Sequence, residues 1–193
     1  GACVTFGPDD VDEAEVASAA ITYLEGYLFD PPAAQDAFRK AARAAHAAGR
    51  KIALTLSDAF CVGRHRSAFR EFVKAETDIL FANEAELLSL YETEDFDAAI
   101  AMLREEVALA AVTRSEKGSV VIAGAERWDV AAVPTTVVDT TGAGDAYAAG
   151  FLAGLAKGLP LAECGRWGSV AAAEAIGHFG ARPQADLKAL VGA

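Results

Sequence analysis

The sequence predicts an α/β fold, a three-layer α/β/α domain with a mainly parallel central sheet, and three observations carry this prediction. Short apolar segments alternate with longer segments of helical periodicity. Within each short segment nearly every residue is apolar, which is typical of strands covered on both faces in a parallel sheet. The chain has 193 residues, 53% of them hydrophobic and 23% charged, so it can bury the core of one ordinary domain. We therefore treat residues 1–193 as a single domain.

The elements of the first half follow from local patterns. A short apolar and aromatic strand is expected at residues 21–24. The run Asp30-Pro31-Pro32 should end it and begin a helix over 33–48, because proline suits the first helical turn and aspartate is a good cap. Gly49 is the expected end of that helix. The further elements expected up to residue 113 are strand 52–56, helix 64–74, strand 79–81, a helix that starts at Asn83, helix 96–106 and strand 109–113.

The second half of the chain departs once from the alternation of strands and helices. Two short strands, at 119–122 and 126–130, flank Gly124 and predict a β-hairpin near one edge of the sheet. Two helices are expected next, over 143–157 and 161–176. A last short helix should cover Gln184 to Leu190.

Composition and charge exclude several functions. The chain has 17 Lys and Arg against 28 Asp and Glu, a formal net charge of −11, which disfavours nucleic acid as a partner. Cys3, Cys61 and Cys164 are far apart and form no CxxC motif, so free thiols in a reducing compartment are expected. No apolar run approaches the ~20 residues that a membrane span needs, and no signal peptide is visible. We expect a cytoplasmic protein without a membrane partner.

The most informative segment is the run from Val137 to Tyr147, where a strand end meets Asp-Thr-Thr-Gly-Ala-Gly-Asp and then a helix of small residues. The first amides of a helix have no internal partner, and the helix dipole adds a partial positive charge there. Gly142, Ala143 and Gly144 therefore predict an anion hole for a phosphate or an oxyanion. Asp145, in the same turn, is a candidate general base.

A simpler interpretation of this segment stays open. Gly142-Ala143-Gly144 can be a tight turn only, and Asp145 a favourable charge at a helix start. Two other phosphate motifs are excluded, because GxxxxGK[ST] is absent and Tyr147 stands where GxGxxG requires glycine.

These residues resemble the C-terminal signature of the ribokinase-like (PfkB) carbohydrate kinases. The run from Asp139 to Asp145 is the strongest match, and other family landmarks occur in order. Asn83-Glu84-Ala85-Glu86 resembles the NxxE motif, the run from Thr113 to Gly118 resembles the TxGxxG nucleotide loop, and the tail around Gly180 resembles the closing helix and turn. The run from Tyr23 to Tyr27 further resembles the adenosine-kinase-like branch. The resemblance covers nearly the whole chain and implies a ribokinase-like domain.

The resemblance implies an ATP-dependent kinase. Asp145 would deprotonate the acceptor hydroxyl, and the amides of Gly142, Ala143 and Gly144 would stabilise the transferring phosphoryl group. Asn83 and Glu86 would hold Mg²⁺ through water. The alternative for these two residues is a helix cap and a solvated helix face.

The same resemblance assigns residues to the nucleotide. Thr113 and Gly118 would border the ATP phosphates and ribose. Ser115 stands where the family usually has glycine, which puts a close backbone approach at that point in doubt. Ser169 falls near the adenine pocket, with the alternative of a small residue inside a packed helix.

A monovalent-cation site, with potassium as the candidate ion, is also implied. Asp139 and Thr141 would form it with carbonyl groups near Ala175, His178 and Gly180. The alternatives are a turn carboxylate for Asp139 and a surface or helix-end histidine for His178.

The resemblance also implies that an N-terminal part is missing, with its early strands, its β lid and the glycine pair for the acceptor. The leading function is phosphorylation of a sugar or nucleoside hydroxyl, adenosine being one candidate, with a homodimer through the lid region as a further expectation. The first alternative is a non-catalytic module, derived from such a kinase, that binds nucleotide or a partner. The second is a dinucleotide-dependent oxidoreductase, which requires an early GxGxxG that the sequence lacks.

Overall fold

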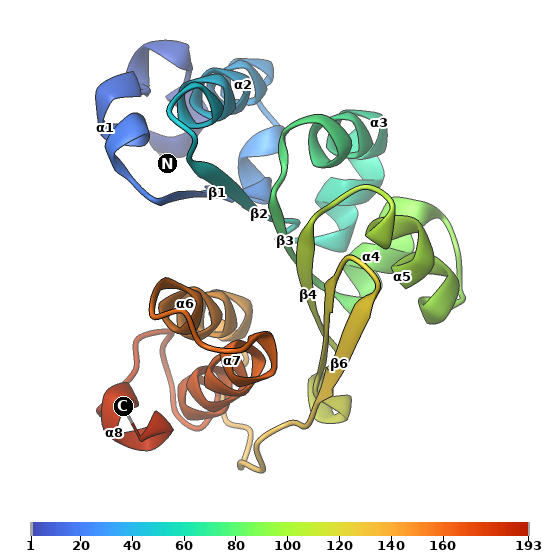
Figure 1. The fold of residues 1–193 in the computed structure, drawn as a ribbon, viewed down its shortest axis with the longest axis vertical. Helices are drawn as coiled ribbons and strands as arrows, with labels where there is room; N and C mark the ends of the chain where they lie inside the picture. The colour runs from blue at the N-terminus through green and yellow to red at the C-terminus, as the bar shows by residue number, and fades with distance from the viewer. Residues whose placement is uncertain (1, 193) are drawn as a thin grey trace. The chain divides into compact units, whose positions relative to one another are not determined.

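The computed structural model describes residues 2–192, which form two compact units divided between Ala110 and Ala111. Six strands are hydrogen-bonded in chain order, β1 to β6, and the boundary between the units falls inside β4 (Figure 1). The first strand pairs are parallel and the last is antiparallel. The α/β class and the mainly parallel sheet are therefore confirmed.

The first unit is built from parallel strands joined by helices. Strand β1 pairs with β2 from Ile21 opposite Lys51 to Glu25 opposite Thr55, and β2 pairs with β3. The helix α2 ends as predicted, because Gly49 adopts a left-handed φ of 67° just beyond it. The elements are η1 (Ala2–Thr5), η2 (Pro8–Asp10), α1 (Glu13–Ser18), β1 (Ile21–Glu25), η3 (Gly26–Phe29), α2 (Pro32–Ala47), β2 (Lys51–Thr55), α3 (Ala59–Glu76), β3 (Ile79–Asn83), α4 (Glu84–Tyr91), α5 (Phe96–Arg104) and β4 (Leu109–Thr113).

A cluster of phenylalanines forms part of the core of this unit. Phe29 stacks on Phe69 with ring centroids 4.0 Å apart and meets Phe38 edge-on at 5.4 Å. Phe72 and Val73 of α3 are also buried. Aromatic pairs of this kind add to the stability gained by burial.

Two predicted boundaries in this unit are wrong. Helix α3 begins at Ala59 instead of residue 64, capped by the Asp58 side chain, and it kinks at His65, whose φ and ψ are not helical. Asp30 does not cap α2, because the cap position is Pro31. The Asp30 carboxylate accepts hydrogen bonds from Arg64 instead, so a tertiary ion pair replaces the local cap that its position predicted.

The second unit holds the predicted hairpin and two long helices. The turn at Gly124 joins β5 to β6, with Ser119 opposite Val130 and Ala123 opposite Glu126. The last helix starts three residues later than predicted, behind the cap residue Asp186. The elements are η4 (Ser115–Lys117), β5 (Ser119–Ala123), β6 (Glu126–Val130), α6 (Ala143–Ala156), α7 (Leu161–Ala175) and α8 (Leu187–Val191).

Helices α6 and α7 lie side by side and approach through glycines (Figure 1). A side chain at Gly150 would place its Cβ 2.5 Å from the Trp167 carbonyl oxygen, and one at Gly168 would place it 2.8 Å from that of Tyr147. Gly165 of α7 faces Val130 of the hairpin in the same way, at 2.8 Å. These contacts leave no room for larger residues, so α6 and α7 pack closely at these glycines. Within residues 2–192, every helix is too short or too polar to cross a membrane.

Candidate functional site

The N-terminus of α4 is closed by its own side chains. Asn83 caps the helix by accepting a hydrogen bond from the Glu86 amide at 2.8 Å, and Glu86 accepts one from the Asn83 amide at 2.8 Å. The Asn83 side-chain amide also donates to the second carboxylate oxygen of Glu86 at 2.7 Å. This reciprocal arrangement is a capping box. The cap expected as the alternative role of Asn83 is therefore present.

Glu86 is not on a solvated helix face, since only 5% of the residue is exposed. Burial, with smaller contributions from the carboxylates of Asp58 and Glu25, raises the pKa of Glu86 to about 7, against the opposing effect of the hydrogen bond from the Asn83 amide. A buried carboxyl with a raised pKa beside other acids is typical of functional sites.

Three residues near Glu86 were not predicted from the sequence. Glu25 ends β1, and Ser57 and Asp58 follow β2, so all three stand at carboxyl ends of parallel strands, as Asn83 does. The Ser57 hydroxyl donates to Glu25 at 3.1 Å, and Ser57 has a left-handed φ of 64°. Open α/β sheets bind ligands at this edge, so polar residues directly after each strand were the signal that would have found them.

The N-terminus of α6, unlike that of α4, is not closed by a side chain. Gly142 stands at the cap position with a left-handed φ of 78°, and no side chain caps the helix. A Cβ at Gly142 would lie 2.6 Å from the Ala181 Cβ, whereas a Cβ at Gly144 would meet nothing within 4 Å. The fold therefore requires glycine at 142 but leaves open space beside 144. Asp145 is exposed in the same turn.

Asp139 ties the loop before α6 to the segment after α7. One carboxylate oxygen accepts from the Thr141 amide at 3.0 Å and the Thr141 hydroxyl at 2.7 Å, and the other accepts from the Gly180 amide at 3.3 Å. The hydrogen bonds from Thr141, with that from Gly180, hold the pKa of Asp139 below its usual value. The turn carboxylate expected as an alternative role of Asp139 is present.

The predicted nucleotide loop is a tight turn between β4 and β5. Thr113 ends β4, and Ser115 adopts a left-handed φ of 52°, the conformation that favours glycine. The serine is thus accommodated where the family pattern has glycine. A Cβ at Gly118 would come 2.0 Å from the Val130 carbonyl oxygen, so the hairpin requires this glycine whether or not nucleotide binds.

Contacts inside the second unit bring this loop, α6 and α7 together. The Tyr147 hydroxyl of α6 donates to the hydroxyl of Ser119, which follows Gly118, at 2.8 Å, and both groups are buried. Burial raises the pKa of Tyr147 to about 12. Gly168 of α7 packs on the Tyr147 carbonyl, and its neighbour Ser169 is buried. Two of the candidate nucleotide residues, Gly118 and Ser169, are therefore next in sequence to residues that contact Tyr147.

The candidate cation residues also lie within the second unit. Ala175, at the end of α7, is fully buried. The Ile176 carbonyl accepts a hydrogen bond from the Val138 amide at 2.8 Å. His178 stands 3.3 Å from the carboxylate of Glu174, as the expected helix-end histidine would. Among residues 2–192, no group of three or more His, Cys, Asp or Glu side chains is arranged to hold a metal ion.

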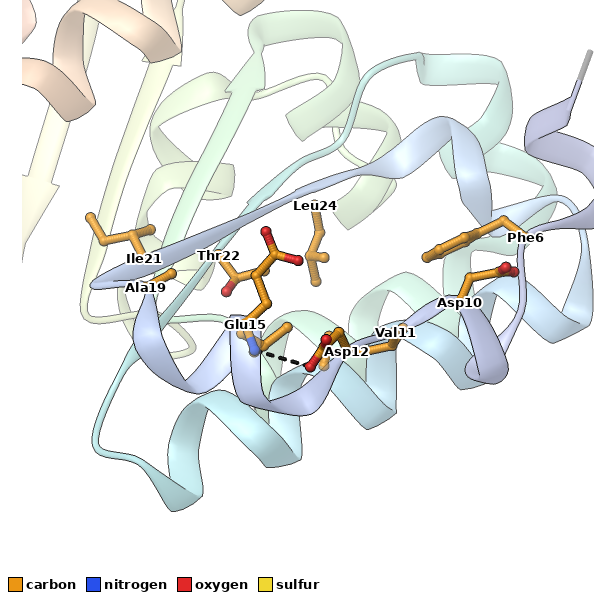
Figure 2. A pocket seen from close by; sticks show the side chains of 11 residues that line it. Phe6, Asp10, Val11, Asp12, Glu15, Ala19, Ile21, Thr22 and Leu24 are labelled. Carbon is orange, nitrogen blue, oxygen red and sulfur yellow. Dashed lines mark hydrogen bonds between the residues drawn. The ribbon is translucent and has the colours of Figure 1, made fainter.

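The first unit contains a pocket that is lined by none of the predicted site residues. It has a volume of about 350 Å³ and is lined by residues between Phe6 and Ala19, by β1 and by Ala41 of α2. Figure 2 shows Phe6, Glu15 and Leu24 around it. None of its lining residues was predicted to bind or catalyse.

The model of the pfkB family carbohydrate kinases matches residues 2–187, and the chain belongs to this family. The crystal structure of adenosine kinase from Sinorhizobium meliloti is 56% identical and superposes with a TM-score of 0.96 over 100% of this chain and 59% of that chain. A probable sugar kinase from Rhizobium etli is 46% identical, with a TM-score of 0.96 over 98% of this chain and 58% of that chain.

The chain is shorter than its relatives. Cytidine kinase from Thermococcus kodakarensis is 41% identical over 120 residues, which is 61% of this chain and 43% of the relative. The chain spans about half the length of the curated relatives that it matches.

Proposed function

We propose that this chain is the nucleotide-binding and catalytic portion of an ATP-dependent kinase that phosphorylates a hydroxyl of a sugar or nucleoside. The observation that carries the proposal is the start of α6. No side chain caps this helix, the space beside Gly144 is open, and Asp145 is exposed in the same turn. Helix starts of this kind bind anions such as phosphate, and an exposed carboxylate in the same turn could serve as the base for an acceptor hydroxyl.

The residues of this turn would have two roles, binding of the phosphoryl group and acceptance of the proton. The Ala143 amide already donates to the Thr140 carbonyl at 3.2 Å, so the proposed anion hole depends mainly on the amides of Gly142 and Gly144. Fixed donors aimed at the transferring phosphoryl group are the main means of catalysis in such reactions. Asp145 would accept the proton of the attacking hydroxyl.

Asn83 and Glu86 suit Mg²⁺ as outer ligands better than as direct ones. Each carboxylate oxygen of Glu86 already accepts a hydrogen bond from Asn83, and the Asn83 carbonyl oxygen accepts one from Glu86. Direct coordination would break the capping box, whereas a metal-bound water can use the remaining lone pairs. Mg²⁺ usually keeps several of its waters. The bound ion would neutralise charge on the phosphates.

The remaining proposed contacts concern the nucleotide and a monovalent ion. Thr113, Ser115, Gly118 and Ser169 would border ATP. Potassium would lie beside Asp139 and Thr141, facing carbonyls of Ala175, His178 and Gly180. The support for potassium is that hydrogen bonds already join Asp139 to Thr141 and Gly180.

The acceptor is proposed from chemistry and from the relatives' names. Those names include adenosine kinase, cytidine kinase and fructoselysine 6-kinase, all of which denote hydroxyl-bearing small molecules. We propose a nucleoside first, because the relative with 56% identity is an adenosine kinase.

Calorimetric titration with Mg-ATP and with NAD tests nucleotide binding. We expect the chain to bind ATP, and binding of NAD without ATP would overturn the proposal. The catalytic role requires the longest natural polypeptide that contains this chain. There, Asp145→Asn should lower turnover by about 10²–10⁴-fold while ATP affinity changes little. Wild-type turnover in that variant would reduce Asp145 to a helix-terminus charge.

The non-catalytic module, derived from such a kinase, remains the second candidate. It predicts ATP or partner binding with no phosphorylated product from any nucleoside or sugar. The same turnover assay on the wild-type polypeptide separates the two functions.

A further inference from the structure

Glu174 holds the segment after α7 in place. It lies in the last turn of α7, and its side chain is only 11% exposed. One carboxylate oxygen accepts hydrogen bonds from the Gln184 amide at 2.9 Å and the Ala185 amide at 2.8 Å, and stands 3.3 Å from His178. The other oxygen is buried and has no hydrogen-bond partner among residues 2–192. Hydrogen bonds to an ionised carboxylate are about twice as strong as neutral ones.

The segment that Glu174 holds, residues 177–186, is the same segment that supports the start of α6. The Gly180 amide donates to Asp139 at 3.3 Å. The Ala181 side chain occupies the space that a side chain at Gly142 would need. The loop that forms the candidate anion hole is therefore braced from one side by this segment.

We propose that Glu174 is a positioning residue, which sets the Gly142–Gly144 loop through residues 177–186 without touching a ligand. The geometry gives two links, from Glu174 to the amides of Gln184 and Ala185, and from Gly180 and Ala181 to Asp139 and Gly142. The catalytic consequence rests on the proposed kinase function, but the positioning itself does not.

A second anchor makes the proposal testable, because it keeps the segment attached when Glu174 is changed. Leu187 packs against the apolar cluster of Ala146, Ala171 and Ala175. Figure 1 shows α8, which contains Leu187, beside α7. Loss of Glu174 should therefore loosen residues 177–186 without detaching α8.

The test compares Glu174→Ala, Glu174→Gln and Glu163→Ala in the 193-residue chain. Glu163 lies on the same helix, and its carboxylate accepts a hydrogen bond from Arg166 at the surface, so it is the matched control. Amide NMR reports on Gly142, Gly144 and Gly180. Mg-ATP titration reports on binding.

We expect Glu174→Ala to shift the Gly142 and Gly144 amide signals and to speed hydrogen exchange at Gly180 by about 10-fold or more. ATP affinity should fall about 5-fold or more. Glu174→Gln keeps an acceptor for both amides and should restore the signals, and Glu163→Ala should leave them unchanged.

Three results would overturn the proposal. They are unchanged Gly142 and Gly144 signals in Glu174→Ala, shifts spread evenly over the second unit, or Glu174→Gln behaving as Glu174→Ala. If Glu174→Ala does not fold, Glu174→Asp replaces it, because its shorter side chain withdraws the oxygen from the two amides. If the wild-type chain fails to bind ATP, the proposed function fails, while the amide signals still decide on the positioning role.

Discussion

The starts of α4 and α6 differ in how the unpaired amides of the first helical turn are treated. Each helix leaves amides without partners at its first turn. Helix α4 satisfies them with its own side chains, through the capping box of Asn83 and Glu86. Helix α6 begins at a glycine that offers no side chain and stands beside open space at Gly144. A helix start that is not closed by its own residues is available to a ligand, so the contrast supports the proposal that phosphate binds at the start of α6.

The largest effect that tests this contrast concerns the buried carboxyl of α4. Because the pKa of Glu86 is raised from 4.5 to about 7 in the folded chain, the folded state binds this proton more tightly than the unfolded state does. The resulting stability is fully present below about pH 4.5 and is lost as pH rises through about 7. The shift corresponds to at most about 3 kcal/mol.

Urea unfolding across this pH range measures the effect, with Glu86→Gln as the control that removes the titrating group. We expect the wild-type free energy of unfolding to fall relative to that of Glu86→Gln as pH rises. Parallel curves for the two proteins would show that Glu86 has an ordinary pKa.

At the start of α6, Gly142→Ala should destabilise the chain by about 1–3 kcal/mol, because a left-handed φ and a close contact with Ala181 both oppose a side chain. Gly158→Ala is the matched control, since Gly158 has a similar φ of 72° but no atom within 4 Å of its Cβ position. Denaturant unfolding should show a greater loss for Gly142→Ala. Equal losses would mean that Ala181 does not constrain the loop.

Asn83→Ala should cost about 1 kcal/mol, with a range of about 0.5–2. The comparison is Asp95→Ala, because Asp95 caps α5 with ordinary hydrogen bonds to Asp97 and Ala98. Loss of Asn83 also takes a partner from the buried Glu86, so thermal unfolding should show the larger decrease for Asn83→Ala. A larger decrease for Asp95→Ala would contradict the special role of the α4 box.

The smallest expected effect is at Gly144. Its Cβ position is open and its backbone is helical, so Gly144→Ala should raise stability by up to about 1 kcal/mol. ATP binding should weaken, because the methyl group occupies the space proposed for the phosphate. Thermal unfolding measures the expected rise in stability, and calorimetry measures the expected loss of ATP affinity. Unchanged ATP affinity would remove Gly144 from the proposed anion hole.

Local patterns predicted much of the fold. Strand β4 runs from Leu109 to Thr113, as its continuous apolar residues predicted, and Gly49 ends α2 as a left-handed residue. The start of α3 was missed because Phe60, in its first turn, is 79% exposed and breaks the apolar pattern. Asp30 was misassigned because its ion pair with Arg64 joins residues 34 positions apart, which no local pattern records.

In the candidate site, too, some features could be predicted from local sequence and others depend on the fold. The motif from Asp139 to Asp145 predicted the uncapped helix start, because glycine and small residues encode it locally. The burial of Glu86 and the contacts of Glu174 could not be predicted, since an acidic residue in a helix is usually solvated. Both depend on neighbours that the fold supplies, Asp58 and Glu25 for the first and residues 178–185 for the second.

The glycine contacts between α6 and α7 also have an entropic consequence. Side chains buried in a helix interface ordinarily lose rotamer freedom, at a cost that rises with their length. Gly150 and Gly168 meet the facing helix as bare backbone and have no rotamers to lose. These two glycines therefore add no loss of side-chain entropy to the pairing of α6 with α7.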